Sequence, residues 1–172
     1  MKYPVTPTSA QRQMREDDFI VSKTDIKGRI TYGNRIFIEF SGYSEAELLG
    51  AQHNIIRHPD MPRAVFKLLW DTIQAKKECN AYVKNMAKDG SFYWVFANVT
   101  PNFDNNSNVI GYFSVRRKPK ASGVETVTGL YRSMLQEEQR AGARDAIAAS
   151  TRILTDLLAA KGLSYDELVL AI

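Results

Sequence analysis

The chain of 172 residues contains a single cysteine, Cys79, and no long uninterrupted run of apolar residues. One cysteine cannot form an intramolecular disulfide, which favours a reducing compartment such as the cytoplasm. The apolar stretches fall short of the roughly 20 residues that cross a bilayer, so no membrane span is expected. Residues 1–15 are polar and lack the apolar segment of a signal peptide. We therefore expect a soluble, cytoplasmic protein.

The sequence also lacks the motifs on which most enzyme active sites depend. It contains no glycine-rich phosphate loop, no metal-ligand cluster and no nucleophile motif, and nothing near His58-Pro59-Asp60 supplies an oxyanion site. The net charge is +4, but Lys and Arg are scattered among Asp and Glu instead of forming a stripe. We expect neither catalysis nor nucleic-acid binding.

Secondary-structure signals predict two strands, several short helices and then three strands. Asn34 and Ser44 are suitable N-caps for the short helices, and Pro62 suits the first turn of a longer one. The expected strands cover residues 18–22, 29–33, 80–86, 91–101 and 109–117. The expected helices between the second and third strands cover residues 35–40, 45–49 and 63–73. This order predicts an α+β fold, a five-stranded antiparallel sheet with short helices on one face.

The character of the sequence changes at both ends of this region. Boundaries are expected between an N-terminal lead, a central domain and a C-terminal helical extension, at 1–16, 17–120 and 121–172. The lead is predicted to be flexible or weakly helical. Capping boxes begin at Ser122 and Ser164, and Gly142 is expected to break or bend the extension.

The extension has two apolar stripes at helical spacing. The stripes are formed by Leu130 and Met134, and by Ile147, Leu154 and Leu158. They predict either a homodimer through these helices or a helical hairpin that folds back on its own sheet.

Local motifs in the central domain resemble the PAS superfamily. Residues 34–50 are similar to its "N-x-x-F…sGY…eL-G" pattern, and Lys88-Asp89-Gly90 resembles its strand-turn-strand signature. The string from His53 to Pro62 resembles the equivalent stretch of the aerotaxis receptors. The resemblance covers roughly residues 17 to 120 and implies a PAS sensor domain that holds FAD non-covalently and transmits its redox state.

The resemblance also implies which residues retain the cofactor. It assigns Arg57, His58 and Asp60 to FAD retention, each acting directly or by holding the loop closed. Arg57 has a fork that suits phosphate or carboxylate, although an ion pair with Asp60 is an alternative. His58 has a pKa near neutrality and suits proton movement, although an isolated histidine is more often structural.

Three more residues are candidates for the same cofactor. Asn85, expected on a central strand, offers both a donor and an acceptor to the edge of a flavin ring. Trp70 lies on the helix that flanks the pocket, where ordinary core packing is the alternative. Asn34 lies at a helix start near the pocket, and capping alone also explains it.

Two departures from related flavin domains affect the pocket. Cys79 stands where a pocket-wall Trp is usual in flavin PAS domains of this type, so we expect either a lost wall or a small buried side chain. The light-sensing LOV domains carry a reactive cysteine that is absent here, and their last-strand Gln corresponds to Arg116. Cysteinyl photochemistry is therefore not expected.

Two other interpretations stay open at this point. One is a haem or small-ligand sensor, for which His53 and His58 are the available imidazoles. The other is an interaction module with an empty pocket. The full aerotaxis receptors continue into a membrane anchor and a signalling coiled coil, and this chain ends at Ile172. Output is therefore expected to pass to a separate signalling partner of the chemoreceptor type.

Overall fold

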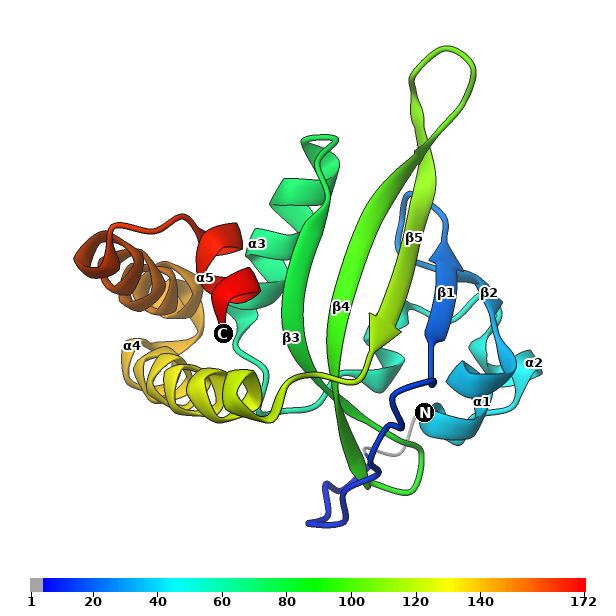
Figure 1. The fold of residues 1–172 in the computed structure, drawn as a ribbon, viewed down its shortest axis with the longest axis horizontal. Helices are drawn as coiled ribbons and strands as arrows, with labels where there is room; N and C mark the ends of the chain where they lie inside the picture. The colour runs from blue at the N-terminus through cyan, green and yellow to red at the C-terminus, as the bar shows by residue number, and fades with distance from the viewer. Residues whose placement is uncertain (1–4) are drawn as a thin grey trace.

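The computed structural model describes residues 5–172 and confirms the α+β prediction (Figure 1). Five strands form one antiparallel sheet in the order β2-β1-β5-β4-β3. The strands are β1 (Ile20–Thr24), β2 (Ile30–Gly33), β3 (Cys79–Met86), β4 (Phe92–Phe103) and β5 (Val109–Arg117). The helices are α1 (Arg35–Ser41), α2 (Glu45–Leu48), the 3-10 helix η1 (His53–Ile56), α3 (Arg63–Gln74), α4 (Ala121–Lys161) and α5 (Tyr165–Ala171). Across residues 5–172, none of the helices combines the length and the hydropathy that a membrane span requires.

The short helices between β2 and β3 begin where the sequence predicts. The Asn34 side chain accepts a hydrogen bond from the Phe37 N–H, and Ser44 forms a complete capping box with Glu47. These local interactions direct α1 and α2 beside β1 and β2, whereas α3 lies beside β3 (Figure 1). Buried residues of α1 and α3, among them Phe37, Ala64 and Val65, join the sheet in one hydrophobic core.

Strand β3 lies at one edge of the sheet, so the prediction that Asn85 is on a central strand is wrong. The hairpins β3-β4 and β4-β5 place β5 next to β1, which leaves β3 at the end of the row. An edge strand exposes unpaired backbone groups and needs a cover. Helices α4 and α5 lie beside β3 on the side away from β1 (Figure 1).

Close packing against Tyr82 holds the C-terminal helices on β3. A Cβ atom at Gly123 would lie 2.3 Å from the Tyr82 ring, so only glycine allows α4 to approach this closely. The Tyr131 hydroxyl donates to the Tyr82 carbonyl at 2.8 Å, and the Tyr82 hydroxyl donates to the Ile172 carbonyl at 2.9 Å. The extension is therefore part of the same packed body as the sheet.

Helix α4 is bent at Gly142, as predicted, because this residue has a φ of 76° that side-chain-bearing residues rarely adopt. The capping box at Ser164 is confirmed, but the one at Ser122 is wrong. Helix α4 begins at Ala121, since the Lys120 carbonyl already accepts from the Val124 N–H, and Ser122 therefore lies inside the first turn.

The apolar stripes of the extension are largely used inside the chain. Met134 is completely buried, Leu154 is 5% exposed, and both belong to the main core. Leu130 and Leu158 pack against that core, whereas Ile147 is 37% exposed. These residues form the fold-back hairpin that the sequence left as an alternative. The homodimer through the C-terminal helices stays a prediction.

Residues 5–16 of the lead are not helical, which corrects that part of the prediction. The first four residues lie outside the described part. It runs in extended form along the β3-β4 turn, where the Thr8 N–H donates to the Gly90 carbonyl and the Phe92 N–H donates to the Ala10 carbonyl. Gln11 and Phe92 form a parallel bridge. Backbone pairing with the turn, a long-range contact, supplies the order that local propensity lacks.

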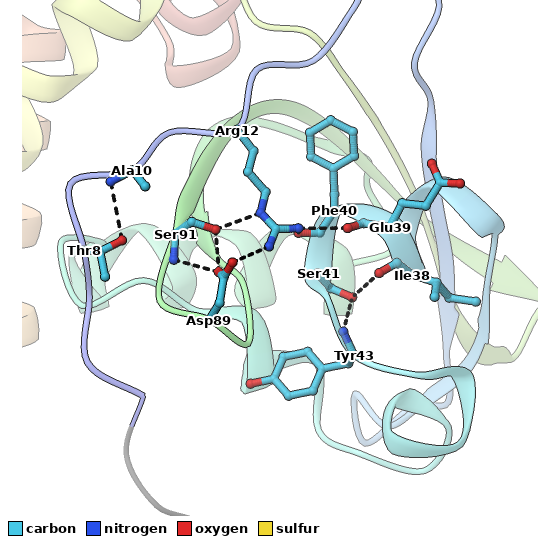
Figure 2. A network of polar contacts seen from close by, with 10 residues as sticks. All are labelled: Thr8, Ala10, Arg12, Ile38, Glu39, Phe40, Ser41, Tyr43, Asp89 and Ser91. Atoms are coloured by element: carbon cyan, nitrogen blue, oxygen red, sulfur yellow. Dashed lines mark hydrogen bonds and ion pairs between the residues drawn. The ribbon is translucent and has the colours of Figure 1, made fainter.

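Arg12 fastens the lead to two separate elements (Figure 2). Its guanidinium donates to Ser91 Oγ and Asp89 Oδ2 on the β3-β4 turn, both at 2.7 Å. It also donates to the carbonyls of Glu39 and Phe40, which lie at the end of α1 and lack helical partners. Hydrogen bonds from Ser91 and Arg12 hold the pKa of Asp89 at about 2.

We expect Arg12→Ala to lower the free energy of unfolding by about 1–2 kcal/mol, because two carbonyls and a carboxylate lose their donors. Urea denaturation followed by circular dichroism measures this change. Arg35→Ala is the matched control, since Arg35 forms one exposed ion pair with Glu39 and should cost under about 0.5 kcal/mol. Equal, small effects of the two substitutions would contradict a fastening role for Arg12.

Candidate functional site

A cavity of about 510 Å³ lies between the sheet and the segment formed by η1 and α3. Its wall is mainly apolar, and its volume is typical of small-molecule sites. Exposed residues of α3, Arg63, Lys67 and Asp71, also line it, so the cavity opens along this helix. Alternate residues of four strands form the other wall: Ser22, Thr24, Val83, Asn85, Ala97, Val99, Tyr112, Ser114 and Arg116.

Arg57 and Asn85 meet at the edge of the sheet and both line the cavity. Their backbones form an isolated antiparallel bridge, so the loop after η1 covers part of the free edge of β3. The Arg57 guanidinium donates to the Met61 carbonyl at 3.0 Å and lies 4.4 Å above the Phe66 ring. No ion pair joins Arg57 to Asp60. Two of the six predicted cofactor residues are thus brought together.

Asn85 has an unsatisfied donor at the cavity wall. The residue is 4% exposed, and its Nδ2 atom has no hydrogen-bond partner among the described residues. A buried amide N–H without a partner costs free energy, so such groups in native proteins usually face a ligand or water. The carboxamide is therefore placed to bind a polar ligand edge.

A second polar group at the wall consists of Arg116, Ser22 and His53. The sequence analysis named His53 only as a haem ligand of the alternative interpretation, and it assigned neither Arg116 nor Ser22 to the site. Arg116 donates to Ser22 Oγ, which shares a hydrogen bond of 3.1 Å with His53 Nε2. His53 stacks on Phe37, and burial and then the charge of Arg116 lower its pKa to about 3. His53 is therefore neutral at neutral pH, with its Nε2 already engaged. The available signal was the correspondence of Arg116 to the last-strand Gln of the LOV domains.

His58 and Asp60 do not line the cavity. The buried His58 ring lies edge-on to Phe92, and its Nδ1 accepts from the Asp60 N–H at 3.0 Å. Burial and then the charge of Lys84 lower the pKa of His58, so the ring is neutral at neutral pH. Asp60 forms an ion pair with Lys84 at 2.6 Å. These contacts tie the loop to β3 and fit the indirect role of holding it closed.

Asn34 does not line the cavity either. Its side chain forms hydrogen bonds with backbone groups instead. Its Oδ1 accepts from the N–H groups of Phe37 and Val21, both at 3.0 Å. Its Nδ2 donates to the Phe19 carbonyl at 2.8 Å. Asn34 therefore caps α1 and ties it to β1, which is the capping role that the sequence left as the alternative.

Trp70 lines the cavity, whereas Cys79 lies behind its wall. The Trp70 ring meets Tyr112 edge-on, with 5.5 Å between ring centroids. Cys79 is buried in a small apolar cluster that includes Ile73 and Val99. Burial and the nearby Asp166 raise the pKa of the thiol to about 12, so it stays protonated. Cys79 is thus a small core side chain.

Comparisons with known proteins place this geometry in context. The chain is 35% identical over 127 residues to the aerotaxis receptor of Escherichia coli strain K12, a match that covers 74% of this chain and 25% of the receptor. It is 29% identical over 97 residues to the nitrogen fixation regulatory protein of Klebsiella pneumoniae, which covers 56% of this chain and 20% of that protein. The chain therefore spans a quarter or less of the length of these relatives.

Solved structures and a family model agree on the fold. The light-state structure of the LOV domain of the blue-light photoreceptor Aureochrome1 superposes with a TM-score of 0.56 at 24% identity, covering 66% of this chain and 90% of that one. The family model described as "PAS fold" matches residues 30–116, just over half of the 172 residues. This match lies inside the region over which the motifs resemble PAS domains. The chain belongs to the PAS family.

Proposed function

We propose that the chain is a sensor of redox state or oxygen that binds FAD non-covalently in the cavity. The observation that carries this proposal is the buried, unpartnered Asn85 amide at a mainly apolar wall. A flavin ring has flat apolar faces and one edge of alternating donors and acceptors, which a carboxamide matches. The similarity to the aerotaxis receptor supports a flavin. The choice of FAD over FMN rests on the family resemblance alone.

The residues at the cavity opening fit the phosphates of such a cofactor. Arg63 and Lys67 lie one helical turn apart on α3 and line the opening, and Arg57 lies beside them in the wall. Lys67 also pairs with Asp71 at 2.7 Å, which a phosphate oxygen would compete with. Trp70, further along the helix, supplies an apolar surface for the ring. The ring would then point inward and the phosphates outward.

When bound, the flavin supplies the redox chemistry, and this chain's residues respond to it. Asn85 belongs to β3, which contacts α4 through Tyr82 and Tyr131. Glu138 of α4 accepts from the Ala64 N–H at the start of α3 at 3.3 Å. A rearrangement at the cavity wall would therefore change how α4 packs. We propose that a separate cytoplasmic signalling protein of the chemoreceptor type detects this change, and that the chain itself catalyses nothing.

The first test is a visible absorption spectrum of the freshly purified protein, before and after dithionite, with the released chromophore identified by mass. The proposal predicts a flavin spectrum that bleaches on reduction, and the release of FAD. A Soret band would instead indicate a haem sensor, with His53 as the imidazole at the cavity. A colourless protein that fails to take up added FAD would leave an interaction module with an empty pocket.

We expect Asn85→Ala to weaken flavin binding about tenfold or more, because the ring edge loses its donor and acceptor. Fluorescence titration of the apoprotein with FAD measures the dissociation constant. Asn80→Ala is the matched control on the same strand, since Asn80 does not line the cavity and should change binding less than about twofold. An equal loss of FAD affinity in both variants would show that the effect comes from disturbing the strand and not from the Asn85 amide.

We expect the double variant Arg63→Gln/Lys67→Gln to weaken FAD and FMN binding about fivefold while leaving riboflavin binding unchanged, because only the first two carry phosphate. Added salt should reduce this difference. The control is Arg132→Gln/Lys120→Gln, which removes two exposed cations elsewhere. A loss of riboflavin affinity of the same size would contradict phosphate recognition.

A further inference from the structure

Arg116 is a buried cation with donors to spare. Its side chain lines the cavity from β5 and is 2% exposed. One guanidinium nitrogen donates to Ser22 Oγ, and the guanidinium plane lies 4.6 Å above the Phe37 ring. The Nε and Nη1 atoms have no hydrogen-bond partner among the described residues. Three N–H donors on these two nitrogens are thus left for a ligand.

No negative charge of the described residues compensates this cation. Among the ion pairs found in residues 5–172, none includes Arg116. Its polar neighbours are Ser22, the neutral His53 and the Tyr93 hydroxyl, whose own oxygen also lacks a partner. The carboxylate that lines the cavity, Asp71, is exposed at the opening and is paired with Lys67.

The buried, uncompensated charge of Arg116 is expected to lower the stability of the ligand-free protein. Burial lowers the pKa of Arg116 to about 10, so the group still carries its charge at neutral pH. A buried charge without a partner destabilises a fold, and natural sequences retain one mainly where a ligand completes it. The small side chain of Ala97, which is paired with Arg116 in the sheet, leaves space on the cavity side.

We propose that Arg116 is the counter-ion of a negatively charged, planar group of the ligand. On the function proposed above, on which this inference rests, that group is the pyrimidine end of the flavin ring, which becomes negative when the ring is reduced. Arg116 lines the cavity from β5 and Asn85 lines it from β3. Asn85 would then recognise the ring in either state, whereas Arg116 would favour the reduced anion.

Sulfite addition tests this assignment without any signalling partner. The sulfur lone pair forms a bond to flavin N5, and the ring electron pair moves onto the N1–C2=O end, so the ring becomes an anion with no other reactant. A nearby cation stabilises this product. The dissociation constant for sulfite, read from bleaching of the flavin absorption band, therefore reports the charge at this end of the ring.

We expect Arg116→Gln to weaken sulfite binding about tenfold or more, and Arg116→Lys to retain most of the wild-type affinity. The two-electron midpoint potential should fall in Arg116→Gln by about 30 mV or more, which is the same tenfold change for two electrons. Binding of oxidised FAD should change less than the affinity for sulfite. Arg117→Gln is the control, because it removes an exposed cation that lies on the same strand outside the cavity wall, and it should leave the potential unaltered.

The apoprotein separates this role from a structural one. If Arg116 serves the ligand, the urea midpoint of flavin-free Arg116→Gln or Arg116→Met should equal or exceed that of the wild type, because an uncompensated charge is removed. Unfolding of the Gln, Met and Lys variants alike would assign Arg116 to the core and overturn the inference. If the wild-type protein binds flavin but Arg116→Gln leaves the sulfite affinity and the potential unchanged, the inference about Arg116 is overturned and the proposed function stands. Wild-type protein that binds no flavin would overturn the proposed function as well.

Discussion

The free edge of β3 is the constraint on which the rest of the structure depends. Every backbone group on that edge needs a partner or a cover, and the chain supplies both from segments on either side of the strand in sequence. The backbone bridge between Arg57 and Asn85 closes the edge beside the cavity. Tyr131 and Gly123 of α4 cover it around Tyr82. The backbone bridge that covers the edge also positions two cavity-lining side chains, Arg57 and Asn85. The cover of the sheet edge and the wall of the cavity therefore depend on the same contact.

The predicted and observed polar side chains in and near the cavity differ in whether the protein supplies partners for their buried polar atoms. Asn34 and His58 have partners within the protein, and their removal would damage the framework around the site. Asn85 and Arg116 are buried, line the cavity and retain donors without a partner among the described residues. Because buried donors without partners are rare in native proteins, this incompleteness distinguishes residues that hold the site from residues that await a ligand.

Local signals in the sequence predicted the parts of the fold that local interactions determine. The caps at Asn34 and Ser164 and the bend at Gly142 follow from side-chain and backbone preferences within a few residues. The edge position of β3, the order of the lead around Arg12 and the buried cluster at Arg116 depend on contacts between residues more than 70 positions apart, which no local pattern encodes. Of the predicted cofactor residues, Arg57, Trp70 and Asn85 line the cavity. The motif that contains Arg57 also contains His58 and Asp60, which do not line it, and the motif alone does not separate the two kinds of residue.

The β3-β4 hairpin touches the lead at one end and the last helix at the other. Phe92 pairs with the lead just after the turn, and Tyr82 donates to the carbonyl of Ile172. Asn85 lies between these two attachment points on the same hairpin. The two flanking segments are therefore mechanically coupled through a single pair of strands, although they are more than 150 residues apart in sequence. A displacement of this hairpin would register at both flanks simultaneously, so a spectroscopic label on either one would sense the same motion.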